Sequence, residues 1–105
     1  MKKNVAIYAR TAGADSKEQL QGQMRCLRDY SKKRIGVEPA EFFDESIAGM
    51  TADRPGLQEL FEHCVANEGT LVLVASPDRL ARSMILFEIL DRFSNTGADV
   101  HYVKT

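Results

Sequence analysis

The sequence predicts an α/β fold with a mostly parallel four-stranded sheet flanked by helices. Short apolar runs alternate with longer stretches in which apolar residues recur at helical spacing, in the order β-α-β-α-β-α-β. The run at 70–74 is apolar almost throughout, as expected for a central strand covered on both faces. Strands that alternate with helices favour a parallel sheet with helices on both of its faces. With 105 residues, the chain has room for one domain.

The composition is that of an ordinary globular chain, with 44% apolar and 28% charged residues and a net charge of −1. Any contact with DNA must therefore come from a local cluster of arginines and lysines. No apolar run reaches membrane-spanning length, and none after the first residues is long enough for a signal peptide. Cys26 and Cys64 fall on the apolar faces of expected helices, which predicts reduced core thiols and a cytoplasmic location.

The first strand is expected over residues 5–8, which are rich in β-branched and aromatic side chains. Arg10 follows where this strand should end. Ligands of open α/β sheets bind outside the carboxyl ends of the strands. An arginine at this place, followed by small polar residues, indicates an anion site, and the alternative is an ordinary surface arginine.

The first helix is expected over residues 17–33, because apolar residues recur there at helical spacing: Leu20, Met24 and Leu27. The basic residues 32–34 suit the carbonyl end of the helix dipole, and Gly36 is the expected stop. This basic triplet is most simply a solvated helix end, and contact with a phosphate backbone is the less favoured interpretation.

The second strand is expected over residues 40–44 and a loop over 45–53. The second helix begins within the segment 53–57, Asp-Arg-Pro-Gly-Leu, since proline is tolerated in the first turn of a helix. After the third strand at 70–74, a third helix capped by Ser76 runs to about residue 95.

The fourth strand is expected over residues 100–103, after a break at Gly97. In such a sheet the first and third strands end at one edge of the molecule, so Arg10 should converge with Arg79 and Arg82. Arg79 and Arg82 lie on the same side of a helical turn, and Asp78 could hold one guanidinium. The alternative is a surface of ion pairs with three aspartates: Asp15, Asp44 and Asp53.

Three convergent arginines fit the stabilisation of a phosphoryl transition state, whose negative charge is spread over several oxygens. Arginine is suited to this because its planar fork matches phosphate oxygens. The sequence predicts no metal ion and no cofactor, because it has no His/Cys cluster and no glycine-rich phosphate loop. His63 and His101 are isolated and are interpreted as ordinary helix or strand residues.

Three segments resemble the catalytic domain of the serine recombinases, a family of resolvases, invertases and large integrases. They are Tyr-Ala-Arg at 8–10, Asp-Arg-Pro-Gly-Leu at 53–57 and Asp-Arg-Leu-Ala-Arg-Ser at 78–83. The likeness covers nearly the whole chain, and the last two segments together are specific. Gln21 or Gln23 also resembles a glutamine in the first helix of these proteins.

The resemblance implies a metal-free reaction in which a serine hydroxyl attacks a DNA phosphodiester. It leaves a 5′-phosphoserine link and a free 3′-hydroxyl, and strands are exchanged within a tetramer and rejoined. DNA and further copies of the full-length protein are the implied partners, and DNA integration or a mobile element is the implied setting. By motif position Arg10, Arg79 and Arg82 would hold the phosphate and Asp78 would orient an arginine. The supporting residues would be Tyr8, Gln23 and Arg54.

The sequence departs from the family pattern at the nucleophile. The family motif reads Tyr-x-Arg-Val-Ser, but here Thr11 and Ala12 occupy the last two positions. A methyl group cannot attack phosphorus, so the domain is expected to be inactive as given. A family arginine expected after the second strand has no counterpart in residues 45–47, and the Ser-Gly of that loop is Ala-Gly at 48–49.

Three explanations of Ala12 stay open. The first is an engineered serine-to-alanine change, and the second is a natural variant that does not cleave DNA. The third is that another hydroxyl takes the place of the missing serine. Ser16, four residues further on, is the better substitute because strand alternation should point Thr11 away from Arg10.

Residues 1–105 are expected to be one recombinase catalytic domain without the dimerisation helix and DNA-binding domain that follow in the family. The alternative function is a non-catalytic module that uses the arginine edge to bind a phosphate or a partner protein. A small α/β enzyme or a response-regulator-like domain is disfavoured, because no acidic pair follows the first strand.

Overall fold

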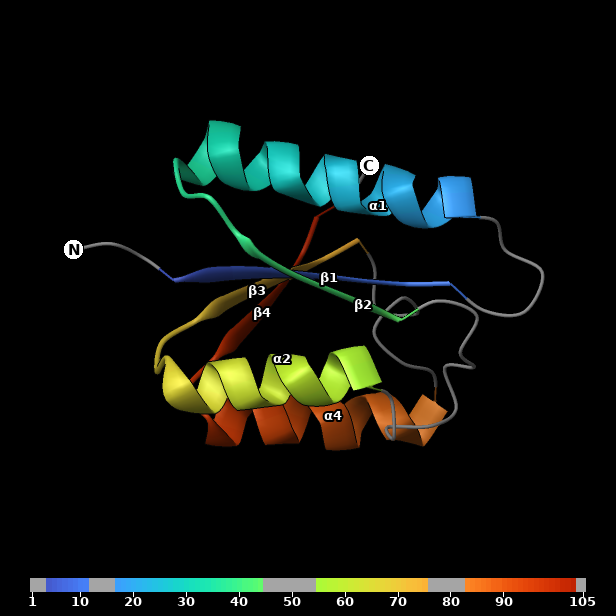
Figure 1. The fold of residues 1–105 in the computed structure, drawn as a ribbon. Helices are drawn as coiled ribbons and strands as arrows, with labels where there is room; N and C mark the ends of the chain where they lie inside the picture. The colour runs from blue at the N-terminus through green and yellow to red at the C-terminus, as the bar shows by residue number, and fades with distance from the viewer. Residues whose placement is uncertain (1–3, 12–16, 45–54, 76–82, 104–105) are drawn as a thin grey trace.

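The computed structural model describes residues 4–11, 17–44, 55–75 and 83–103. Strands and helices alternate along the chain as the sequence predicts (Figure 1). The elements are β1 (Val5–Arg10), α1 (Lys17–Tyr30), the π-helical turn η1 (Ser31–Ile35), β2 (Ala40–Asp44), α2 (Pro55–Ala66), β3 (Leu71–Val74), α4 (Ser83–Asn95) and β4 (Asp99–Tyr102).

The four strands form one sheet in the order β2-β1-β3-β4, and all three pairings are parallel. β1 therefore lies inside the sheet, between β2 and β3. Tyr8 is opposite Phe42 on one side and Val74 on the other, while Arg10 is opposite Asp44. The predicted α/β class and its parallel sheet are confirmed.

Helices cover both faces of the sheet, as Figure 1 shows: α1 lies on one face, and α2 and α4 lie side by side on the other. All six residues of β1 are buried. Their alternation divides the core, because successive side chains of a strand point to opposite faces. Val5, Ile7 and Ala9 pack with α1, whereas Ala6 and Tyr8 pack with α2 and α4.

The end of the first helix differs from the expectation. Its α-helical part ends at Tyr30 rather than at residue 33, and η1 continues the turn to Ile35. The buried Ser31 hydroxyl donates to the carbonyl of Val37 at 2.6 Å, and Gly36 donates its N–H to the Ser31 carbonyl. Gly36 has φ 82°, so a glycine is favoured at the stop that the sequence predicts.

Both cysteines are free thiols, but only Cys64 is a core residue. Cys26 is half-buried, because it lies about 100° around the helix from Leu27 and so on the flank of the apolar face. Burial raises the pKa of the Cys64 thiol to about 11. No helix within the described ranges has both the length and the apolar character needed to cross a bilayer.

Candidate functional site

The carboxyl ends of β1, β2 and β3 meet at one edge of the sheet. β1 is hydrogen-bonded to both of the other strands and runs parallel to them. Arg10 is the last residue of β1, and Asp44, opposite it in the register, is the last residue of β2. The structure thus places Arg10 at the edge where an open α/β sheet binds its ligands.

Arg10 is held firmly at this edge. Its residue is 1% exposed, and by strand alternation its side chain lies on the same face as Tyr8, toward α2 and α4. Gln23 of α1 donates from Nε2 to the backbone carbonyl of Arg10 at 3.1 Å. This bond ties α1 to the end of β1, and it identifies Gln23 rather than the exposed Gln21 as the glutamine beside the site.

A buried carboxylate joins three elements at the same edge. The Tyr8 hydroxyl donates to Oδ2 of Asp44 at 2.6 Å. The backbone N–H groups of Gly56 and Leu57 donate to Oδ1 and Oδ2 of Asp44 at 2.8 and 3.0 Å. These N–H groups belong to the first turn of α2, where they have no partner within the helix and where the dipole favours an anion. Asp44 therefore fixes the start of α2 against β1 and β2.

Gly56 explains the Pro-Gly pair at the start of α2. A Cβ at this position would collide with the backbone carbonyl oxygen of Phe43. Glycine is required so that the first turn of α2 can approach β2 closely enough for its N–H groups to reach Asp44. Close packing of α2 against β2 thus explains the glycine in the Pro-Gly pair, independently of the resemblance to the serine recombinases.

The sequence does not identify Asp44 as a site residue, because its pattern indicates only an ion-pair partner for the arginines. The available signal was an acidic residue at the expected end of a strand, eleven residues before a Pro-Gly helix start. Together Tyr8, Gln23 and Asp44 hold the end of β1 between two helices. These contacts fix the backbone from which the buried Arg10 side chain projects.

The remaining predicted site residues lie outside the described ranges: Ala12, Ser16, Arg54, Asp78, Arg79 and Arg82. The convergence of Arg79 and Arg82 on Arg10 therefore stays a prediction, although β3, which precedes them, is adjacent to β1. Thr11 is buried, and its backbone N–H donates to the Asp44 carbonyl at 3.1 Å. Its backbone thus continues the pairing of β1 with β2, and alternation puts its side chain on the opposite face from Arg10.

A sequence model of the family described as "Resolvase, N terminal domain" matches residues 5–105. The chain belongs to this family of serine recombinase catalytic domains. The resemblance found in the three sequence motifs is therefore confirmed. No curated protein matches the chain.

Solved serine recombinases share the fold of this resolvase-family domain. The C-terminal catalytic domain of ISC1926 TnpA, an IS607-like serine recombinase, is 30% identical with a TM-score of 0.82, over 96% of this chain and 70% of that one. The N-terminal catalytic domain of TP901-1 integrase is 28% identical with a TM-score of 0.78, over 95% and 76%. The fold is shared by a serine recombinase from Sulfolobus solfataricus, which is 23% identical with a TM-score of 0.72. The match covers 99% of this chain and 72% of that one.

The two histidines of the resolvase domain have structural partners. His63 Nε2 lies 2.9 Å from Oδ1 of Asn4, its ring packs against Phe42, and burial lowers its pKa. His101 Nε2 lies 3.4 Å from the Tyr30 hydroxyl. Among the described residues, no three His, Cys, Asp or Glu side chains are grouped so that they could share a metal ion.

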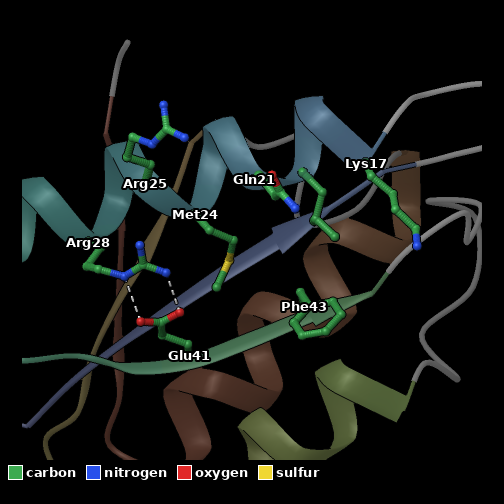
Figure 2. Close-up of a pocket in the computed structure, with 8 residues that line it drawn as sticks. Lys17, Gln21, Met24, Arg25, Arg28, Glu41 and Phe43 are labelled. Atoms are coloured by element: carbon green, nitrogen blue, oxygen red, sulfur yellow. Dashed lines mark hydrogen bonds and ion pairs between the residues drawn. The ribbon is translucent and has the colours of Figure 1, made fainter.

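A groove of about 520 Å³ lies between α1 and β2 (Figure 2). Leu20, Met24 and Phe43 supply its apolar surface. An ion pair crosses it, because Arg28 donates from Nε and Nη2 to the carboxylate of Glu41 at 2.8 and 2.7 Å. The hydrogen bond from Arg28 holds the pKa of Glu41 below its usual value.

Proposed function

We propose that this chain is the catalytic domain of a site-specific DNA recombinase, and that Ala12 leaves it unable to cut DNA as given. The observation that carries the proposal is the placement of Arg10, which is buried at the carboxyl end of β1 and held there through Gln23. The family match over residues 5–105 supports the chemistry. The names of two relatives, an integrase and an IS607-like serine recombinase, support DNA as the substrate.

In the proposed reaction, which requires a serine in place of Ala12, the hydroxyl oxygen at position 12 attacks the phosphorus of a DNA phosphodiester. The hydroxyl gives up its proton as a new bond joins its oxygen to phosphorus. The bond from phosphorus to the 3′-oxygen breaks, and the 3′-oxygen takes up a proton, so that protons balance. Arg10, with Arg79 and Arg82, stabilises the negative charge on the phosphoryl oxygens. Asp78 orients one of these guanidinium groups. Rejoining is the reverse attack by a 3′-hydroxyl.

The alanine side chain has no atom that can make this attack, so the parent chain is expected to bind DNA and leave it intact. Strand exchange requires more than one copy, and we propose a dimer or tetramer of the full-length protein. A cytoplasmic location fits two free cysteines in a chain whose partner is DNA.

The second candidate function follows from Ala12 itself. On this alternative the arginine edge is retained to bind a phosphate group or a partner protein, and the chain serves as a regulatory or assembly subunit. The two candidates differ in one outcome, which is whether restoring a hydroxyl restores cleavage.

The test is Ala12→Ser, with Ala12→Gly as the matched variant that lacks a hydroxyl. Each protein is incubated with a pooled library of duplexes, and protein-linked DNA is recovered under denaturing conditions and sequenced. We expect covalent adducts with Ala12→Ser alone. In that background Arg10→Lys should lower adduct yield about 100-fold, because one lost donor of a phosphoryl site costs that much.

Absence of adducts from a folded Ala12→Ser protein would favour the binding module. Adducts formed by the parent chain and abolished by Ser16→Ala would identify Ser16 as the substitute nucleophile. Parent adducts that persist in Ser16→Ala would exclude that residue.

A further inference from the structure

Positive charge is concentrated in one segment of this chain. Residues 17–35, which form α1 and η1, contain six Lys or Arg and two Asp or Glu, a net charge of +4 in a chain of net charge −1. The remaining residues therefore carry a net charge of −5. Within this segment α1 carries a net charge of +1, and Lys32, Lys33 and Arg34 of η1 supply the other +3.

Part of this charge forms a row beside the groove. Lys17, Gln21, Arg25 and Arg28 are spaced four, four and three residues apart, line the groove, and are called here the α1 ridge. Figure 2 shows them along α1, with Arg25 pointing away from β2 and Arg28 turned toward Glu41. Among the described residues, Lys17 and Arg25 form no ion pair, whereas Arg28 is paired with Glu41.

The ridge begins at the edge that carries Arg10. Lys17 is the first residue of α1, and Gln23 of the same helix is bonded to the Arg10 backbone. Across the groove, Phe43 is opposite Ala9 in the strand register, next to the Arg10–Asp44 pair. Phe43 is 52% exposed, which is unusual for an aromatic residue on a strand.

The dimensions of the ridge suit a nucleic acid backbone. From Lys17 to Arg28 the helix rises roughly 16 Å at 1.5 Å per residue. One DNA strand has a phosphate about every 3.4 Å along the helix axis, so a ridge of this length faces several consecutive phosphates. Lysine, glutamine and arginine are donors that bind phosphate oxygens, and the apolar Phe43 ring can cover a deoxyribose.

We propose that the α1 ridge and Phe43 bind the sugar–phosphate backbone of duplex DNA that flanks the phosphate held at Arg10. This inference rests on the proposed function, because it assigns the ridge to the same substrate. Charge complementarity fits a polyanion, and continuity with the Arg10 edge favours DNA over an acidic protein. Such contacts position the duplex and do not read its sequence.

The test compares two double variants with the same change in net charge. Lys17→Gln/Arg25→Gln removes the two cations of the ridge that lack ion pairs, and Lys33→Gln/Arg34→Gln removes two exposed cations at the far end of the same segment. Binding of a labelled duplex of about 20 bp and arbitrary sequence is followed by fluorescence anisotropy between roughly 50 and 200 mM NaCl.

We expect the ridge variant to lose about tenfold in affinity at low salt, and its salt slope to fall by about two, since each phosphate contact contributes close to one. The far-end variant should stay within about threefold of the parent, because bulk charge alone has changed. Phe43→Ala should weaken binding without altering the slope, since it removes an apolar contact.

Equal losses in the two double variants, parent-level binding by the ridge variant, or no binding by the parent at low salt would each overturn the inference. Tighter binding of polyglutamate than of the duplex would assign the ridge to an acidic protein instead. If Ala12→Ser forms adducts but the ridge variant binds DNA as tightly as the parent, this inference alone is contradicted. Ridge-dependent binding without adducts would contradict the catalytic proposal alone.

Discussion

The two faces of the sheet are built differently, although the same strands supply both. On the α1 face, β2 presents Glu41 and Phe43, which line an open groove with an exposed ion pair. On the other face, β2 presents Phe42 and Asp44, and Asp44 is 4% exposed and fully engaged with Tyr8 and α2. Alternate residues of β2 thus line an open groove on one face and hold buried elements together on the other.

The comparison teaches where this domain can tolerate change. The α2 and α4 face is closely packed and holds the end of β1 in place, so substitutions there should alter stability first. On the α1 face the groove beside β2 is open and lined by basic residues, so substitutions in this groove should alter binding first. Three predictions test this division, and each pairs a residue of one face with its counterpart on the other.

The largest effect is expected from Gly56→Ala, with Gly22→Ala as its counterpart on α1. The new Cβ at position 56 would collide with the Phe43 carbonyl, and displacing α2 should cost roughly 3 kcal/mol of unfolding free energy or more. At Gly22 nothing lies within 4 Å of a new Cβ, so alanine should stabilise the helix by about 0.5–1 kcal/mol.

Chemical denaturation measures both changes. The interpretation of the Pro-Gly pair is wrong if Gly56→Ala leaves the unfolding midpoint unchanged. A loss of stability at Gly22 comparable to that at Gly56 would show that the loss at position 56 does not come from the collision with the Phe43 carbonyl.

An intermediate effect is expected from Asp44→Asn, compared with Glu41→Gln on the same strand. An asparagine at position 44 keeps only one acceptor oxygen for three buried donors, which belong to Tyr8, Gly56 and Leu57. The free energy of unfolding should therefore fall by about 2 kcal/mol. The Arg28–Glu41 pair is about one-third exposed, so its neutralisation should cost less than about 1 kcal/mol after solvent screening.

Thermal unfolding of the two variants at neutral pH checks this difference. The Glu41 contribution should also vanish in acid. Because the folded pKa of Glu41 is lowered, the stability it adds is present above the ordinary carboxyl pKa and is lost as pH falls through the folded value. Equal losses in the two variants would contradict the comparison.

The smallest perturbation uses the two cysteines, one on each face. At pH 8 Cys64 should resist iodoacetamide, because it is buried and its pKa is raised to about 11 by that burial, which leaves about one thiolate in a thousand. Cys26 is half-buried and should be labelled first. Mass spectrometry of the native protein should show one adduct, and two should form in denaturant. Labelling of Cys64 before Cys26 would show that α2 opens more readily than α1.

Local patterns in the sequence were enough to predict the fold. The apolar run at 5–8 and the alternation of strands and helices fixed the class, and Gly36 marked the end of the first helix. The run did not predict that β1 extends to Arg10, because the burial of Arg10 depends on tertiary neighbours that local propensity cannot represent.

The site was predictable only in part, for a similar reason. Arg10 and Gln23 could be named from motif position, and the structure adds the bond that joins them. Asp44 could not be recognised, because its role depends on α2 approaching β2 over a glycine, a contact between segments distant in sequence. The arginines at 79 and 82 lie outside the described residues, so their convergence with Arg10 remains a prediction.

The burial of β1 on both faces fixes the length of this strand. Side-chain direction has a period of two, so inserting or deleting one residue between Asn4 and Arg10 would transfer the guanidinium to the α1 side. A change that precedes Tyr8 would also turn this side chain away from Asp44. A change of two residues would restore direction but move Arg10 by about 7 Å along the strand. The number of residues in β1 thus determines both the direction and the position of the Arg10 side chain.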